Sequence, residues 1–199
     1  MVSRTEVGRQ IIHAGTGITL AALYYFDILS PLAMLLGIIV GILLSFICKR
    51  VDNFPIVGWF LKNYERNEER KSFPGKGLVF YFAGVLLVMQ LFEKDIAIAA
   101  ILILALGDSV SHLYGAKFGK IKNLFNGDGK KLLEGTLAGT VAGALGAMLF
   151  ISIPEAVIGS FAAMMFEVVK IDFNDKTLDD NIIVPLVAGT VIFLLRAYL

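Results

Sequence analysis

Residues 95–119 read DIAIAAILILALGDSVSHLYGAKFG, a long apolar run that leads into acidic, hydroxyl and imidazole side chains. A bilayer core about 30 Å thick is crossed by about 20 mostly apolar residues in a helix. An ionisable group inside such a helix is costly and by default marks a functional site. Asp108 lies in this position. The stretch therefore predicts a membrane helix that carries a functional carboxylate.

The composition of the whole chain agrees with a membrane protein. Its 199 residues are 57% hydrophobic and 18% charged, with a mean hydropathy of +0.76, which is more apolar than one soluble core accommodates. The net charge of +1 gives no reason to expect a nucleic-acid partner. The single cysteine, Cys48, excludes an intramolecular disulfide and argues against a cysteine-based metal cluster. We expect one domain over residues 1–199.

Seven stretches come close to the length of a membrane helix, and only helices or closed barrels satisfy their backbone in hydrocarbon. They are residues 11–26, 30–48, 76–91, 95–114, 132–153, 154–169 and 181–199. The sequence thus predicts an all-α integral membrane bundle of about seven transmembrane helices. The first stretch lacks a convincing small-residue cleavage site after it, so we interpret it as a retained helix, with a cleaved signal as the alternative.

The basic residues indicate the orientation of the bundle. Lysine and arginine precede the first stretch and follow the second, fourth and sixth, whereas the other ends carry Asp27, residues 93–95, Glu155 and Arg196. Because basic residues in short loops are retained in the cytoplasm, this asymmetry predicts a cytoplasmic N-terminus. The protein is expected to be multi-pass, with any active site at the cytoplasmic surface.

Small residues recur at helical spacing in two of the stretches. Gly135, Gly139 and Gly143 share one helix face, and Gly37 and Gly41 share another. Such faces allow helices to approach closely in a membrane. They permit a homodimer, but packing within one chain explains them equally well. No internal repeat is visible, so an inverted-repeat transporter has no positive support.

The polar part of residues 95–119 forms a stripe on a helix. Asp108, Ser111, His112, Gly115 and Gly119 fall on a common face. This is the arrangement of a candidate site, while the structural alternative is a carboxylate paired with a neighbouring helix. Nearer the N-terminus, His13 lies one turn after Arg9 and is interpreted first as a packing residue and second as part of a site.

The loop before the fifth stretch offers a candidate phosphate site. Asp128 is placed to cap a helix start, and Lys130 and Lys131 follow it. Free backbone N–H groups at a helix start bind phosphate well when cations lie beside them. An ordinary surface pair between Lys130 and Glu134, four residues apart, is the alternative.

Further acidic residues are expected at the same membrane surface. Glu167 ends the sixth stretch, and Asp179, Asp180 and Asn181 open the seventh. Oxygen ligands that face basic loops suit Mg²⁺ held between carboxylates and substrate phosphates. Helix capping alone would explain Asp179, but it explains Glu167 poorly.

In these residues the chain resembles the CTP-dependent polyprenol kinases, a family that includes dolichol kinase, phytol kinase and CTP-dependent diacylglycerol kinase. The resemblance is carried by residues 9–13, by Gly107 and Asp108 followed by Gly115 and Gly119, by residues 131–136, and by residues 180–186. It spans nearly the whole chain. Gln10 stands where the family usually has lysine, which puts a phosphate role at this position in doubt.

The resemblance implies transfer of the terminal phosphoryl group of CTP to the hydroxyl of a polyprenol-type lipid alcohol in the membrane, with Mg²⁺. It implies metal-binding or hydroxyl-orienting roles for Asp108 and Asp180, with Glu167 as a further metal ligand. Nucleotide binding would involve Lys117, Lys120, Lys131, Gly115, Gly119, Glu134, Gly135 and Asn181. Arg9 and His13 are weaker candidates for the lipid-alcohol or phosphate site.

Two other functions remain open at this stage. A CTP:phosphatidate cytidylyltransferase or CDP-archaeol synthase shares the Gly-Asp element and a similar Lys and Glu-Gly segment. Those enzymes usually carry Lys-Asp and His-Gly-Gly sequences near the C-terminus, which residues 167–186 lack. A transporter or non-enzymatic membrane component is the second alternative, although the charged residues are predicted to gather at one surface and not at the midplane.

Overall fold

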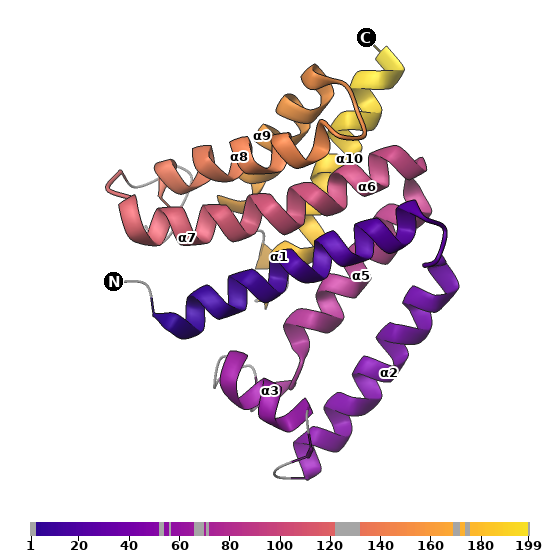
Figure 1. The fold of residues 1–199 in the computed structure, drawn as a ribbon, viewed down its shortest axis with the longest axis vertical. Coiled ribbons are helices and arrows are strands. Elements are labelled where there is room, and N and C mark those ends of the chain that lie inside the picture. The colour runs from indigo at the N-terminus through magenta and orange to yellow at the C-terminus, as the bar shows by residue number, and fades with distance from the viewer. Residues whose placement is uncertain are drawn as a thin grey trace.

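The computed structural model describes residues 3–51, 54–55, 57–65, 70, 72–121, 132–168, 172–173 and 176–198. These residues are almost entirely helical (Figure 1). The elements in chain order are α1 (Arg4–Tyr25), α2 (Pro31–Arg50), α3 (Val57–Tyr64), α5 (Lys76–Leu91), α6 (Lys94–Leu102), the π-helical segment η1 (Ile103–Asp108), α7 (Ser109–Phe118), α8 (Leu133–Ala147), α9 (Ile153–Val168), β1 (Asp172–Phe173), β2 (Lys176–Thr177) and α10 (Asp180–Tyr198).

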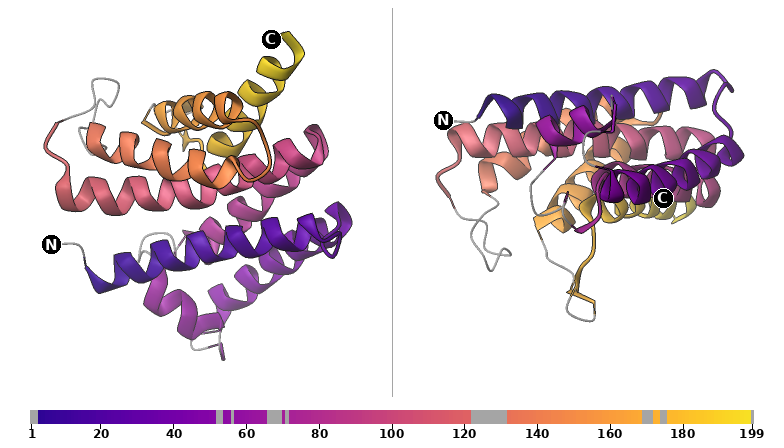
Figure 2. Two further views of the ribbon diagram at one scale, coloured as in Figure 1. Left: turned by 45° about the horizontal axis from the view of Figure 1, so that its top comes forward. Right: turned by 90° about the horizontal axis from the view of Figure 1, so that it is seen from below.

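The centre of the molecule is one continuous helix formed by α6, η1 and α7. It spans the 25 residues Lys94–Phe118, and every residue from 96 to 105 is buried. Helix α8 packs along η1 and α7 on one side, and α1 runs alongside the same helix on another (Figure 2). The small and β-branched residues of this run let neighbours approach from several directions, which makes it the core of the fold.

Glycines bring α7 and α8 into close contact, as the small-residue face of residues 135–143 predicts. A β-carbon built on Gly139 would lie 2.6 Å from the carbonyl oxygen of Gly107. One on Gly135 would lie 2.7 Å from the carbonyl oxygen of Ser111. Because backbone stands where a side chain would go, both positions require glycine. The predicted packing face is therefore used within a single chain.

Each of the seven predicted stretches overlaps a helix, but the membrane assignment is confirmed only in part. Among the described residues, three helices are long and apolar enough to cross a membrane: α2, the α6–α7 helix and α10. Helix α5 is apolar but has 16 residues. Helix α2 buries only 11% of its most apolar window inside the fold, so most of its leucine and isoleucine side chains face outward. Seven spans and a cytoplasmic N-terminus stay predictions.

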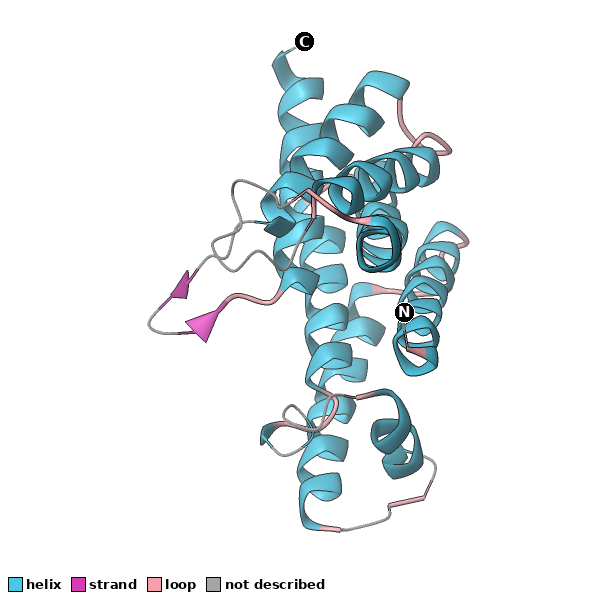
Figure 3. Cartoon of the chain, turned by 90° about the vertical axis from the view of Figure 1, so that its left-hand side faces the viewer, coloured by secondary structure: helices cyan, strands magenta, loops and turns pink. Residues whose placement is uncertain are grey.

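Local signals explain where several helices begin. The Ser3 hydroxyl accepts a hydrogen bond from the Glu6 amide, and the Ser30 hydroxyl accepts one from the Ala33 amide, with Pro31 in the first turn. These are N-caps, which satisfy amides that the helix itself leaves open. The sequence analysis did not predict the amphipathic helix α3 or the antiparallel pair of strands β1 and β2. Figure 3 shows the two strands apart from the helices.

The π-helical segment was not predicted either. Residues Ile103–Asp108 form a wider turn in the middle of the central helix, immediately before the polar stripe. Such π-turns inside α-helices occur frequently at functional sites, because the extra residue per turn re-aims the side chains that follow. Here the wide turn ends at Asp108.

Candidate functional site

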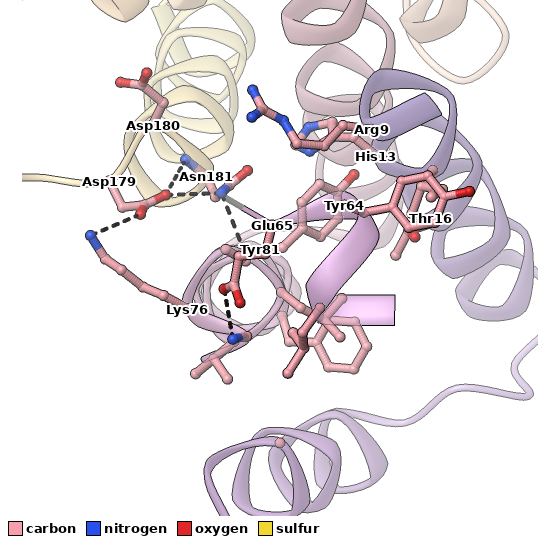
Figure 4. A pocket seen from close by; sticks show the side chains of 18 of the residues that line it. Arg9, His13, Thr16, Tyr64, Glu65, Lys76, Tyr81, Asp179, Asp180 and Asn181 are labelled. Atoms are coloured by element: carbon pink, nitrogen blue, oxygen red, sulfur yellow. Dashed lines mark hydrogen bonds and ion pairs between the residues drawn. The ribbon is translucent and has the colours of Figure 1, made fainter. Parts of the chain in front are cut away.

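A pocket of about 1040 Å³ lies where the ends of several helices meet. Residues of α1, α2, α3, α5, η1, α7, α9 and α10 line it, and Figure 4 shows part of its polar wall. Helices α2 and α3 contribute mainly apolar side chains, among them Ile38, Leu44 and Phe60. The pocket thus has one polar and one apolar wall, which is the arrangement expected for an amphiphilic ligand.

Asp108 lies between the two histidines of the chain. One carboxylate oxygen is 3.3 Å from Nε2 of His13 in α1, and the other is 3.3 Å from Nε2 of His112, one turn further along. Asp108 is only 7% exposed. The His13 ring packs with its edge on Tyr81 at a centroid distance of 4.6 Å, which fixes its orientation. His13 is therefore both a packing residue and a direct neighbour of the buried carboxylate.

Glu167 joins this group from the end of α9. One ligand atom each from Asp108, His112 and Glu167 lie within 4.8 Å of one another. Glu167 is 3% exposed, and Ser111 donates a hydrogen bond of 3.5 Å to its carboxylate. Two carboxylates and an imidazole that converge in a buried space form a donor set that fits a divalent cation. Helix capping does not account for Glu167, in line with the sequence argument.

The start of α10 forms the next part of the polar wall. Asp179 accepts hydrogen bonds from the amide of Asn181 at 3.2 Å and from its side chain at 2.9 Å, so it caps the helix. Lys76 of α5 lies 3.8 Å from the other oxygen of Asp179. Burial raises the pKa of Asp179, although the Asn181 hydrogen bonds and Lys76 act in the opposite direction. Asp180 also lines the pocket.

Helix α10 is held against α5 by a contact that involves the backbone. Pro185 has no N–H to offer to the carbonyl of Asn181, four residues earlier. That carbonyl lies against Gly84 of α5, where a β-carbon would overlap it. The Asn181 side chain reaches the carbonyl oxygen of Gly77 at 3.5 Å. Together these contacts fix Asp180 and Asn181 at the pocket.

Among the buried polar atoms of the pocket wall, Oε1 of Gln10 and the Tyr81 hydroxyl have no hydrogen-bond partner among the described residues. The side chains belong to residues that are 4% and 2% exposed. Buried polar groups in folded proteins nearly always have a partner. A polar ligand in the pocket would supply one. Gln10 therefore belongs to the site as a neutral group.

The structure divides the predicted site residues into two groups. Arg9, His13, Asp108, Glu167, Asp180 and Asn181 line the pocket. Lys117, Lys120, Gly115, Gly119, Glu134 and Gly135 lie at the junction of α7 and α8, where Glu134 accepts hydrogen bonds from the amides of Lys120 and Ile121. Lys131, Lys130 and Asp128 lie outside the described residues. Glu134 thus joins the end of α7 to the start of α8.

Sequence reasoning missed Lys76, Gln10 and Tyr81 as pocket residues, and it placed His112 on the stripe without a role. Lys76 and Arg9 are the two basic side chains of the described pocket lining. Lys76 follows Gly75, whose positive φ of 78° ends the preceding segment and turns the chain into α5. The helix start at residue 76 was predicted from the sequence, but the place of Lys76 at the pocket depends on the contact between α5 and the start of α10.

Comparison with known proteins found two similar sequences. An uncharacterized protein of Methanocaldococcus jannaschii is 29% identical over 189 residues, which cover 94% of this chain and 92% of that protein. CTP-dependent diacylglycerol kinase 1 of Schizosaccharomyces pombe is 26% identical over 161 residues, which cover 70% of this chain and 66% of the kinase. No family model matches the chain, and no solved structure does. The similarity supports a link to CTP-dependent lipid kinases without identifying a substrate.

Proposed function

We propose that the chain is a CTP-dependent kinase that phosphorylates the hydroxyl of a membrane lipid. The observation that carries this proposal is the convergence of Asp108, Glu167 and Asp180 on one pocket whose opposite wall is apolar. A lipid kinase needs both walls, because it joins a charged nucleotide to an acceptor that stays in the bilayer. The similarity to CTP-dependent diacylglycerol kinase 1 supports the same reaction class.

Phosphoryl transfer depends mainly on positioning and on neutralisation of charge. Mg²⁺ held by Asp108 and Glu167 would neutralise the phosphates of CTP. His13, 3.3 Å from Asp108, orients that carboxylate. We assign Asp180 to the acceptor hydroxyl: it takes the hydroxyl proton as the acceptor oxygen bonds to the γ-phosphorus and the bond to the β–γ bridging oxygen breaks. The products are CDP and the lipid phosphate.

The apolar wall is proposed to receive the hydrocarbon part of the lipid. Helix α2 contributes Ile38 and Leu44 to the pocket while Leu36 and Leu43 on the same helix face outward. A helix that borders both lipid and pocket offers a lateral route, so the acceptor reaches the site without leaving the membrane. The resemblance in the sequence points to a polyprenol-type acceptor, and the fission yeast relative is named for diacylglycerol.

The nucleotide is proposed to enter from the cytoplasm. Asp108 lies about ten residues before the end of α7, or about 15 Å of helix rise. Arg9 and Lys76 at the pocket would contact the phosphates. The glycine-rich junction of α7 and α8, with Lys117 and Lys120, would hold the remainder of CTP, and the predicted role of Lys131, which lies outside the described residues, stays part of the proposal. This assignment keeps seven spans and a cytoplasmic N-terminus as part of the proposal.

Labelled nucleotide tests the proposal directly. Purified protein in lipid nanodiscs is incubated with CTP labelled at the γ-phosphate and with either a polyprenol or diacylglycerol. Labelled lipid phosphate is expected with at least one acceptor. A parallel reaction contains phosphatidate and CTP labelled at the α-phosphate. Labelled CDP-lipid, with no transfer from the γ-position, would overturn the kinase and favour the cytidylyltransferase.

A further inference from the structure

The group formed by Asp108, His112 and Glu167 contains a nitrogen donor that a simple magnesium site does not need. Asp108 and His112 lie one turn apart on the central helix, and Glu167 comes from the end of α9. Residues four apart on a helix share a face, so the first two point into the pocket together. Glu167 closes the group from the side. Two helices that pack against the same neighbour, α8, thus hold the three side chains.

The spacing of these atoms suits ligands of one ion. Ligand atoms about 2.1 Å from a metal and at right angles to one another are about 3 Å apart. Nε2 of His112 lies 3.3 Å from a carboxylate oxygen of Asp108, and all three donor atoms lie within 4.8 Å of one another. These separations exceed the spacing of adjacent ligands by up to about 2 Å, a difference within the reach of side-chain rotation.

Two of the three side chains, those of Asp108 and Glu167, also have outer partners that orient them. His13 lies 3.3 Å from the oxygen of Asp108 that faces away from His112, and Ser111 donates to Glu167. Metal ligands in proteins are generally held by such partners, which fix the orientation of the ligand and tune its basicity. The buried surroundings explain why these partners are needed: Asp108 and Glu167 are 7% and 3% exposed.

We propose that Asp108, His112 and Glu167 form a site for a divalent transition-metal ion that binds Mn²⁺ more tightly than Mg²⁺. This rests on the proposed function, because the same carboxylates would serve the nucleotide. Imidazole is a good ligand for first-row transition metals, whereas Mg²⁺ prefers oxygen donors and retains its water. The two carboxylates are compatible with both ions. His112 therefore sets the preference between them.

Direct binding of Mn²⁺ to the full chain in nanodiscs made of uncharged lipids tests the site without nucleotide and without an acceptor lipid. Free Mn²⁺ gives a sharp electron paramagnetic resonance signal that disappears on binding. One Mn²⁺ per chain is expected, displaced only by Mg²⁺ at a concentration at least about tenfold higher. Modulation from imidazole nitrogen in the spin echo of the unmodified protein is expected as well, and it does not depend on how a variant folds.

Two variants assign the nitrogen and control for unspecific binding. His112→Ala should weaken Mn²⁺ binding about tenfold or more and remove the nitrogen modulation, with a smaller effect on Mg²⁺. Glu93→Gln, a carboxylate change at the other end of the bundle, should leave both unchanged. Absence of nitrogen modulation, or equal affinity for the two ions, would overturn the inference. Neither result would affect the kinase proposal, which the labelled-CTP assay tests separately.

Discussion

The two ends of the helix bundle differ in the burial and pairing of their charged side chains. At the end away from the pocket, Arg196 lies within 3.2 Å of Glu93, Asp95 and Glu155, and Lys94 lies 2.7 Å from Asp27. Most of these groups are exposed, for example 72% for Glu93 and 84% for Asp27. At the pocket, the buried Asp108 lies 3.3 Å from both His13 and His112, and one ligand atom each from Asp108, His112 and Glu167 lie within 4.8 Å of one another.

This difference separates a structural ionic cluster from a candidate site. Ion pairs at a surface cost little to form and contribute little to stability. Buried carboxylates gathered together are expensive, and folds retain them mainly where they bind something. Substitutions at the pocket end should therefore reduce activity. Substitutions at the other end should leave activity unchanged and lower stability only slightly.

The largest effect is expected from Asp108→Asn. Loss of the negative charge between His13 and His112 should lower lipid phosphorylation by about 10²-fold or more, because the site can no longer hold a cation against the phosphates. The initial rate with γ-labelled CTP measures it. Asp27→Asn, the same change at the other end, is the control and should retain full activity. A fully active Asp108→Asn enzyme would contradict the assignment of function to the pocket end of the bundle.

A second prediction concerns the glycine contact that supports the pocket. Gly139→Leu places a side chain where the Gly107 carbonyl and Met164 lie, so it should destabilise the fold by about 1–3 kcal/mol. Thermal denaturation in detergent measures the loss. Gly15→Ala is the matched control: its β-carbon would meet nothing within 4 Å, and the better helix former should stabilise α1 by up to about 1 kcal/mol. Equal melting temperatures for both variants would refute the packing argument.

Removal of the cap of α10 should have a smaller effect. Asp179→Ala takes away the acceptor for the Asn181 amide and side chain and should cost about 1 kcal/mol of stability. Asp179→Asn retains a capping oxygen and should recover most of the loss. Activity should fall with Asp179→Ala because Asp180 and Asn181 are then less well positioned. If the two variants have the same stability, capping is not the role of Asp179.

The smallest effect is expected at the other end. Arg196→Gln removes three ion pairs, but the arginine side chain is 33% exposed and its partners Glu93 and Asp95 are more so. Such pairs contribute about 1 kcal/mol or less in total, screened further by salt. Activity per folded molecule should not change. A large loss of turnover in Arg196→Gln would show that both ends serve function.

Helix positions and the grouping of charged residues were accessible from the sequence because they depend on local patterns. The lengths of the apolar runs predicted all seven helical stretches. The acidic residues near Arg196 and those near Asp108 were predicted to lie on opposite sides, and the described residues place them at different ends of the bundle. Asp108 was identified from its place inside an apolar run. The choice between a packing role and a site role for His13 was left open, because its nearness to Asp108 depends on how α1 packs along the central helix.

The remaining features depend on tertiary contacts that one sequence does not encode in a readable way. Glu167 meets His112 only because α9 ends beside the central helix, 55 residues further along the chain. Lys76 reaches the pocket through the start of α5 against α10. The π-helical segment has no distinctive residue pattern, since Ile103–Asp108 reads as an ordinary apolar helix. Packing, and not propensity, decides each of these.

The wide turn at Ile103–Asp108 separates the part of the central helix that packs against its neighbours from the part that carries the polar side chains. Upstream, the helix must present its small apolar residues to every neighbour, while downstream it must aim Asp108 and His112 into one hollow. A uniform helix would lock the two halves into a single rotational setting. Because the wide turn accommodates one extra residue between them, the polar half takes a rotational setting of its own while the packed half keeps its contacts.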